Sequence, residues 1–229
     1  MSKNLLFKTI FLLLFCILPL TGCIRVNEEI WINQDNSGKL LISIGVSEQL
    51  LALAQNNNSQ GNIIDKIPGE INQNLSPSNP FIKNINIQDE IKDGYKYKTY
   101  TADITDLEKF FQTGENNTYS ISEMDNGDLL FKQTIPKVDN VAPNSPNDLG
   151  TNLAKAAFAG DYFKVIIHVN DVVNTNGTLN SDKNIVEWDI PILDLANSTT
   201  STELSIEYKV PWYISVWKFC LSIFSPQNK

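Results

Sequence analysis

Histidine and cysteine are scarce in this chain of 229 residues, which contains one histidine and three cysteines. Protein zinc sites are built from clusters of these two residue types, so zinc and thiol chemistry lack a ligand set here. His168 falls in an apolar run where strand alternation places it on one face with Lys164. We expect a structural role for His168, and the composition predicts no metal site and no cofactor.

One loop has the oxygen-bearing side chains that also begin calcium loops. Asn33, Asp35 and Ser37 precede Gly38, as the first ligands of an EF-hand precede its glycine. The twelfth position of such a loop would be Ile44, which has no carboxylate to bind calcium. These residues therefore predict the turn of a hairpin and not a calcium site.

Catalytic signatures are also lacking. The chain has neither a glycine-rich phosphate loop nor the nucleophile elbow of serine hydrolases. Glu28 and Glu29 are adjacent carboxylates, but neighbours on a strand point to opposite faces, and we expect them to form a solvated edge. We therefore predict that the chain is not an enzyme. The alternative is a carboxylate-dependent hydrolase of the cell envelope, which needs two acids in one pocket.

Basic residues are too few to balance the acidic ones. There are 18 Lys and Arg against 26 Asp and Glu, which gives a formal net charge of −8 at pH 7. An acidic surface repels phosphate groups. We predict that nucleic acid is not a partner.

The first apolar run, residues 9–18, is shorter than the roughly 20 residues that cross a bilayer. It follows Lys3 and Lys8 and leads into the sequence Leu20-Thr21-Gly22-Cys23. This arrangement resembles the signal peptide of a bacterial lipoprotein. The resemblance implies that residues 1–22 are removed and that the Cys23 thiol receives acyl chains such as palmitate. An ordinary secretory signal with an incidental cysteine and an uncleaved anchor are the alternatives.

Acylation of Cys23 would make the membrane the first partner of this protein. Two or three acyl chains hold a domain stably at a bilayer, whereas one gives only marginal binding. The expected location is the bacterial cell membrane or outer membrane, with a lipid-anchored domain on the exported side. Because Cys16 leaves with the signal and Cys23 is modified, Cys220 has no partner for an intramolecular disulfide.

Alternating apolar and polar residues predict three hairpins in the first half of the chain. Residues 24–32 and 39–44 flank Asp35-Asn36-Ser37-Gly38, and residues 81–104 contain Asp93-Gly94 between two alternating runs. Asn, Asp and Gly favour the positive φ angles of tight hairpin turns. A third hairpin is predicted from residues 118–124 and 129–135.

Helices and further strands complete the predicted fold. Helices are expected at residues 46–55 with Ser47 as N-cap, directly after Thr105-Asp106, and at residues 153–158. Strands are expected at residues 162–169, 185–190 and 203–208, with a polar turn at 174–182. The predicted class is α+β, a mostly antiparallel β-sheet of hairpins with a few packed helices, forming one domain over residues 23–209.

Residues 210–229 form a separate aromatic and apolar segment. Its candidate residues for membrane or partner contact are Trp212, Tyr213, Trp217, Phe219 and Phe224. Trp and Tyr suit the headgroup level of a bilayer, which favours an interfacial helix. A terminal helix covering the open sheet face and the remnant of a longer span are the alternatives.

The order of these elements resembles the LppM-like lipoprotein domain. The most specific parts are residues 103–111, with Asp-Leu-Glu-Lys-Phe-Phe, and residues 163–188, where a strand runs into an Asn-Gly turn and a Trp-bearing strand. The resemblance implies an envelope domain that handles lipid and has no known catalytic set. The chain departs from that pattern in the Asn-rich stretch at residues 56–61.

The sequence thus predicts a membrane-anchored envelope lipoprotein that acts as a non-enzymatic binding domain for a lipid or a partner protein. Two alternatives stay open. One is a structural lipoprotein without a ligand, whose sheet edge pairs with another chain. The other is the carboxylate-dependent hydrolase.

Overall fold

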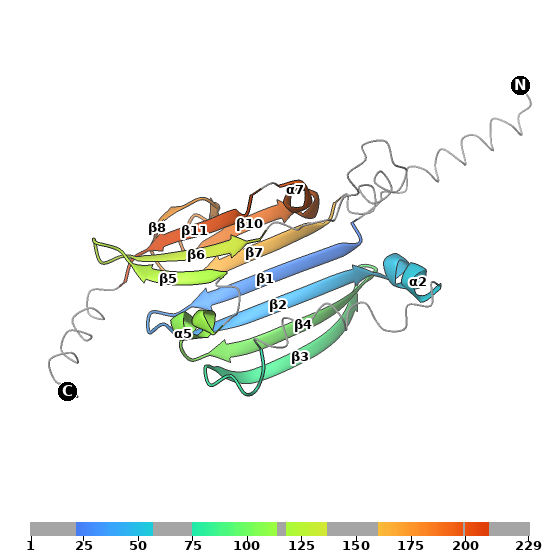
Figure 1. The fold of residues 1–229 in the computed structure, drawn as a ribbon, viewed down its shortest axis with the longest axis horizontal. Coiled ribbons are helices and arrows are strands. Elements are labelled where there is room, and N and C mark those ends of the chain that lie inside the picture. The colour runs from blue at the N-terminus through green and yellow to red at the C-terminus, as the bar shows by residue number, and fades with distance from the viewer. Residues whose placement is uncertain (1–21, 57–74, 114–117, 137–159, 199, 211–229) are drawn as a thin grey trace, which may run out of the picture.

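The computed structural model describes residues 22–56, 75–113, 118–136, 160–198 and 200–210. Most of these residues lie in two stacked β-sheets, and three short helices lie at the margins of the sheets (Figure 1). A fold rich in antiparallel strands with few helices is therefore confirmed.

The larger sheet has seven strands in the order β3-β4-β2-β1-β7-β10-β9. These strands are β1 Ile24–Ile32, β2 Gly38–Ser47, β3 Ile82–Lys92, β4 Tyr95–Ile104, β7 Tyr162–His168, β9 Thr178–Leu179 and β10 Ile185–Pro191. Neighbouring strands are antiparallel except β1 and β7, which run parallel. Strand β1 is paired on both sides, so its side chains face either the second sheet or the outer face.

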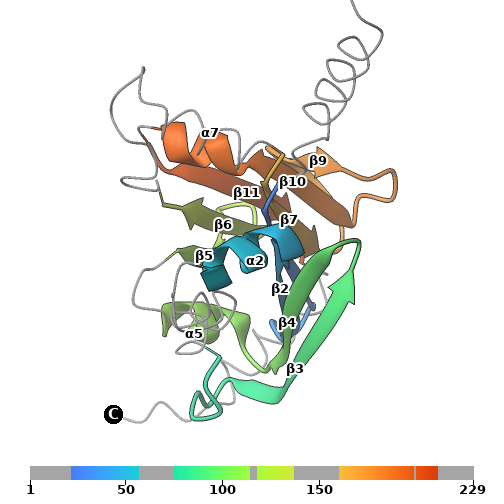
Figure 2. The same ribbon diagram turned by 90° about the vertical axis from the view of Figure 1, so that its right-hand side faces the viewer.

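The smaller sheet has four strands in the order β5-β6-β11-β8. Its strands are β5 Tyr119–Glu123, β6 Leu129–Ile135, β8 Val172–Thr175 and β11 Thr202–Tyr208. The chain leaves the larger sheet after β7, adds β8 to the smaller one and returns for β9 and β10. Figure 2 shows β3 and β4 extending away from the smaller sheet.

The three predicted hairpins are confirmed, and their turns have the expected backbone geometry. Asn36 has a φ of 66° in the turn between β1 and β2. Asp93 and Gly94 have φ angles of 52° and 76° between β3 and β4, which are the two positive values of a type I′ turn. Gly127 has a φ of 83° between β5 and β6.

Two of the three predicted helices are also confirmed. Helix α2, Glu48–Asn56, is capped by Ser47, whose Oγ accepts a hydrogen bond from the Leu50 N–H at 3.2 Å. Helix α5, Leu107–Gln112, is capped by Asp106. Helix α7, Ile192–Asn197, is an addition that the sequence did not predict. The helix predicted at residues 153–158 lies outside the described residues.

Two predictions about polar segments were wrong. The polar turn predicted at residues 174–182 contains the end of β8 and all of β9. Strand β8 forms because its backbone pairs with β11 and Val172 is buried, so sheet pairing outweighs its polar composition. Glu28 and Glu29 do point to opposite faces, but β1 is no edge strand, and Glu28 is only 4% exposed.

The core lies between the two sheets. Ile30, Val165, Ile167 and Val186 contribute from the larger sheet and are fully buried. The smaller sheet contributes a second set of buried side chains, Phe131, Leu204 and Ile206. Helix α5 joins the same core, because the Phe111 ring stacks on the Tyr119 ring with centroids 4.6 Å apart. The two sheets and helix α5 therefore share one core.

Candidate functional site

A cleft of about 600 Å³ lies at one end of the two sheets. It is lined by the turn between β1 and β2, the start of α5, strand β5 and the ends of β7 and β11. Ile32 is the last residue of β1 and Tyr208 the last of β11, and both line it. Its volume falls within the roughly 300–1,000 Å³ typical of small-molecule sites.

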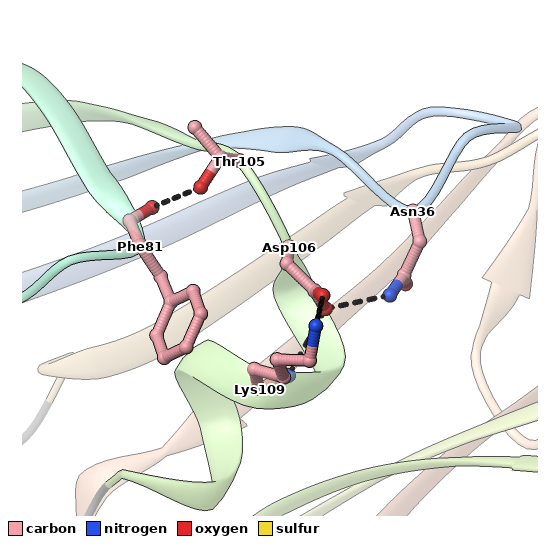
Figure 3. Close-up of polar contacts among 5 residues, drawn as sticks. All are labelled: Asn36, Phe81, Thr105, Asp106 and Lys109. Carbon is pink, nitrogen blue, oxygen red and sulfur yellow. Dashed lines mark hydrogen bonds and ion pairs between the residues drawn. The ribbon is translucent and has the colours of Figure 1, made fainter. Parts of the chain in front are cut away.

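Asp106 fixes one wall of the cleft by joining α5 to the turn between β1 and β2 (Figure 3). Its carboxylate accepts hydrogen bonds from the Lys109 N–H at 3.1 Å and from the Asn36 Nδ2 at 2.9 Å. The Leu107 N–H donates to the Asn36 carbonyl at 2.8 Å. The two hydrogen bonds with Asn36 thus hold the beginning of the helix against the hairpin turn.

Lys109 completes this wall. Its Nζ lies 2.8 Å from the Asp106 Oδ2 and 5.9 Å from the centroid of the Phe81 ring. The Thr105 hydroxyl donates to the Phe81 carbonyl at 3.3 Å (Figure 3). Partial burial opposes ionisation of Asp106, but the hydrogen bonds from Lys109 outweigh it and hold the Asp106 pKa below its ordinary value. The ammonium of Lys109 therefore forms an ion pair with Asp106.

The interior of the cleft is apolar. Ile32 and Val169 are buried side chains at the ends of β1 and β7, and Ile121 and Leu129 are half-buried on β5 and β6. Val210 lies at the end of the described chain and also lines the cleft. An apolar surface inside a polar rim suits a ligand with an apolar portion.

The rim carries more negative than positive charge. Among the described residues, four carboxylates line the cleft, those of Asp35, Asp106, Glu108 and Glu123, together with two ammonium groups, those of Lys109 and Lys209. Hydrogen bonds from the Ser37 hydroxyl at 2.6 Å and the Ser37 N–H at 3.0 Å lower the pKa of Asp35. The rim is therefore net acidic at neutral pH.

Tyr208 lines the cleft, but its hydroxyl oxygen is buried in the packed interior and is not accessible from the cleft. The residue is 5% exposed, and within the described part of the chain its hydroxyl has no hydrogen-bond partner. Burial raises the pKa of Tyr208 above its ordinary value, so the hydroxyl keeps its proton. A buried hydroxyl without a partner is costly to the stability of the fold.

Glu28 connects the two sheets in the core. It accepts hydrogen bonds from the Tyr119 hydroxyl on β5 at 2.6 Å and from the Gln133 Nε2 on β6 at 2.8 Å. Burial raises the pKa of Glu28, and both hydrogen bonds oppose this shift. Burial also raises the Tyr119 pKa well above its ordinary value. This polar cluster joins β1 to β5, whose next inward-facing residue, Ile121, lines the cleft.

His168 lies on the opposite, outer face of the larger sheet. Its Nε2 is 2.5 Å from the Glu29 Oε1, and its ring stacks on Trp31 with centroids 4.7 Å apart and planes inclined by 6°. Within the described ranges no group of three or more His, Cys, Asp or Glu residues is placed to hold a metal ion. The contacts of His168 are those of a residue packed on a sheet face.

Cys23, the predicted lipidation site, lies at the other end of β1 from the cleft. It is half-buried, and its carbonyl accepts a hydrogen bond from the Ser47 N–H at 2.8 Å. The Ile24 N–H donates to the Asp161 Oδ1 at 2.8 Å, and the Tyr95 hydroxyl donates to the Gly22 carbonyl. Ile32, which lines the cleft, is nine positions beyond Cys23 along the chain, which corresponds to roughly 30 Å at ~3.3 Å per residue.

The aromatic residues predicted for membrane or partner contact all lie outside the described residues, namely Trp212, Tyr213, Trp217, Phe219 and Phe224. Sequence reasoning also missed the two most unusual polar side chains, Glu28 and Tyr208. The alternation of residues along the strands could have indicated that both side chains face inward. Glu28 shares a face with Ile30, and Tyr208 shares a face with Ile206, so each lies on an inward-facing position.

Comparison with known proteins yields a distant likeness among solved structures. No protein-family model and no curated protein matches the chain. Among solved structures, the chain is similar to the NMR structure of the folded domain of Mycobacterium tuberculosis LppM, with a TM-score of 0.45 and 13% sequence identity over 82% of this chain and 91% of that one. No helix among the described residues is long and apolar enough to span a membrane.

Proposed function

We propose that this protein is a lipid-anchored domain of a bacterial envelope that binds an amphiphilic ligand in the cleft and performs no chemistry on it. The cleft of about 600 Å³ carries the proposal, since its apolar interior lies beneath a polar rim. Sites for small ligands combine a mainly apolar lining with a few polar groups that fix orientation. A lipid or a similar amphiphile has an apolar chain that suits the interior and a polar group that suits the rim.

The position of Cys23 supports this arrangement. An acylated Cys23 would tether the domain at one end of β1, while the cleft lies at the other end. The ligand would then enter from the side that faces away from the anchor. The arrangement suits a domain that exchanges its ligand with the surrounding envelope space.

The hydrogen bonds and pKa values of two acids at the cleft, Asp35 and Asp106, fit binding without catalysis. Asp106 is occupied by Lys109 and Asn36, and Asp35 is occupied by Ser37. Both pKa values are lowered by these contacts. A general acid needs a raised pKa, which favours a structural role for this pair.

The test is native mass spectrometry of the Cys23→Ser protein purified from envelope extract. We expect a co-purifying amphiphile that is lost in Ile121→Trp, because the larger side chain fills the cleft. Ile87→Trp is the matched control, because Ile87 is 52% exposed on β3 and lies outside the cleft. Equal retention of the ligand in both variants, with both folded by circular dichroism, would reject the cleft as the binding site.

A further inference from the structure

Cys23 is joined to the fold without a linker. Strand β1 begins at the next residue, Ile24, and is paired with β2 on one side and with β7 on the other. The Cys23 carbonyl also accepts a hydrogen bond from the Ser47 N–H at 2.8 Å. A group attached to Cys23 is therefore held at one place, at the end of the larger sheet.

Asp161, the residue before β7, accepts hydrogen bonds from the backbone at this point. Its Oδ1 lies 2.8 Å from the Ile24 nitrogen, and the residue is 2% exposed. Burial raises the pKa of Asp161, while the N–H groups of Ile24 and Cys23 and the charge of Arg25 oppose this shift. Its Oδ2 has no hydrogen-bond partner within the described ranges. Such a carboxylate is best stabilised by a cation that carries several donors.

Removal of the signal would create a cation at this place. Hydrolysis of the Gly22–Cys23 peptide bond consumes one water, gives Gly22 a carboxylate and leaves the Cys23 nitrogen as an ammonium at neutral pH. The amide nitrogen donates one hydrogen bond, whereas an ammonium donates three. Gly22 is buried against Asp161, and a side chain on Gly22 would overlap the Asp161 carboxylate. Departure of Gly22 therefore opens this carboxylate to the new ammonium.

Tyr95 supplies a further acceptor beside the same nitrogen. Its hydroxyl donates to the Gly22 carbonyl, which is bonded through one carbon to the Cys23 nitrogen. Without Gly22, the hydroxyl oxygen can accept a hydrogen bond from the ammonium. Arg25 is the other charged group here, and its guanidinium lies 4.1 Å from the centroid of the Tyr95 ring. Because Arg25 repels an ammonium, the net attraction depends on Asp161.

We infer that Asp161 binds the free α-ammonium of mature Cys23, and that this ion pair fixes the lipid anchor against the end of the larger sheet. This inference rests on the proposed lipid anchor and names the residue that positions it. Acylation of the same nitrogen would remove its charge and leave a single N–H, so the site favours an anchor whose amine is free. The acyl chains then leave the domain beside Asp161, and this end of the sheet lies on the membrane.

The test is competitive labelling of the Cys23 α-amine with acetic anhydride over a range of pH. The full-length chain is expressed in a bacterial host that leaves this amine free, and the mature lipoprotein is purified in detergent. Mass spectrometry of the N-terminal peptide gives the labelled fraction at each pH. We expect the wild-type midpoint about one pH unit above the ordinary α-amine value of roughly 8, because Asp161 stabilises the charged form.

Asp161→Asn tests the origin of this shift, since it removes the charge and keeps an oxygen for the Ile24 N–H. We expect its labelling midpoint to return to the ordinary range, with labelling several-fold faster than in the wild type at pH 8.5. Asp194→Asn is the matched control. Asp194 is an exposed acid on α7, and the first N–H of that helix, on Ile192, donates to the Asp161 carbonyl. This control should label as the wild type does.

The possible failures can be told apart. If the mature protein does not begin at an acylated Cys23, the proposed anchor and this inference both fail. If it does begin there, an ordinary midpoint in the wild type overturns the inference alone, and this measurement needs no variant. Equal midpoints in the wild type and in Asp161→Asn, with both folded by circular dichroism, would likewise overturn it by assigning the shift to another group.

Discussion

Glu28 is a carboxylic acid buried in the core, where its charged form is disfavoured. Its carboxyl is 4% exposed and lies between the two sheets, with two neutral donors, Tyr119 and Gln133, as its hydrogen-bond partners. The buried Oε1 of Gln133 has no partner among the described residues. A glutamine at position 28 keeps an oxygen that can accept from the Tyr119 hydroxyl and removes the carboxylate charge that burial disfavours.

This geometry predicts that Glu28→Gln stabilises the protein at neutral pH. Because the folded-state pKa of Glu28 is raised by burial, its contribution to stability is present below the unfolded pKa and is lost as pH rises through the folded pKa. We expect the free energy of unfolding of the variant to exceed that of the wild type at pH 7.5, because the amide carries no charge that burial disfavours.

Urea denaturation of both proteins at pH 4 and pH 7.5 measures this difference. The difference in unfolding free energy between Glu28→Gln and the wild type should nearly vanish at pH 4, where Glu28 is largely protonated in both the folded and the unfolded state. Glu90→Gln serves as the exposed control on β3, and its difference in stability from the wild type should not depend on pH in this way. A wild-type protein that gains stability over Glu28→Gln as pH rises would refute this assignment.

At the scale of elements, the chain's turns and caps account for most of what the sequence could predict. The turn residues Asn36, Asp93 and Gly94 fix hairpins locally, so the pairing of β1 with β2 and of β3 with β4 follows from short stretches of sequence. Ser47 and Asp106 mark the beginnings of α2 and α5 in the same local way.

Elements that depend on distant partners were not predictable. Strand β8 is short, and its pairing partner β11 lies about thirty residues later in the chain. The burial of Glu28 likewise depends on β1 being central, which requires the parallel pairing with β7. Local periodicity does not tell which strand lies beside which. The cleft could not be predicted for the same reason, because it is assembled from elements spread over the whole described chain.

Helix α5 gives a direct test of the wall of the cleft. Asp106→Ala removes the N-cap, the bond from Asn36 and the ion pair with Lys109. We expect a loss of about 1–2 kcal/mol of unfolding free energy, typical of a cap. Because the Asp106 pKa is lowered, its contribution is present above the unfolded pKa and should fade as pH falls towards 3.

Asp106→Asn is the conservative comparison in the same urea experiment. Its side-chain oxygen can still accept the Lys109 N–H, so it should retain most of the stability that Asp106→Ala loses. If Asp106→Asn and Asp106→Ala are equally destabilised, the cap is not what holds α5 to the turn.

On the scale of the whole molecule, Cys23, the proposed lipidation site, and the cleft lie at opposite ends of β1. We expect Cys23→Ser to release the protein from the membrane fraction of a bacterial host, because the proposed acyl chains on Cys23 would supply the attachment. Cys220→Ser, the matched control in the aromatic segment, should remain at the membrane. Membrane fractionation followed by mass spectrometry of the mature N-terminus measures both outcomes. Retention of Cys23→Ser at the membrane would assign the attachment to another part of the chain.

The central claim is that an amphiphile occupies the cleft between the ends of the two sheets. The most direct measurement is an NMR titration of ¹⁵N-labelled Cys23→Ser protein with 1-monolauroylglycerol. We predict amide shift changes centred on Ile32, Ile121, Leu129, Val169 and Tyr208, which line the cleft, with little change at exposed Ile87 and Ile91 on β3. Saturable changes centred on β3, or none in the cleft at saturating ligand, would contradict the account.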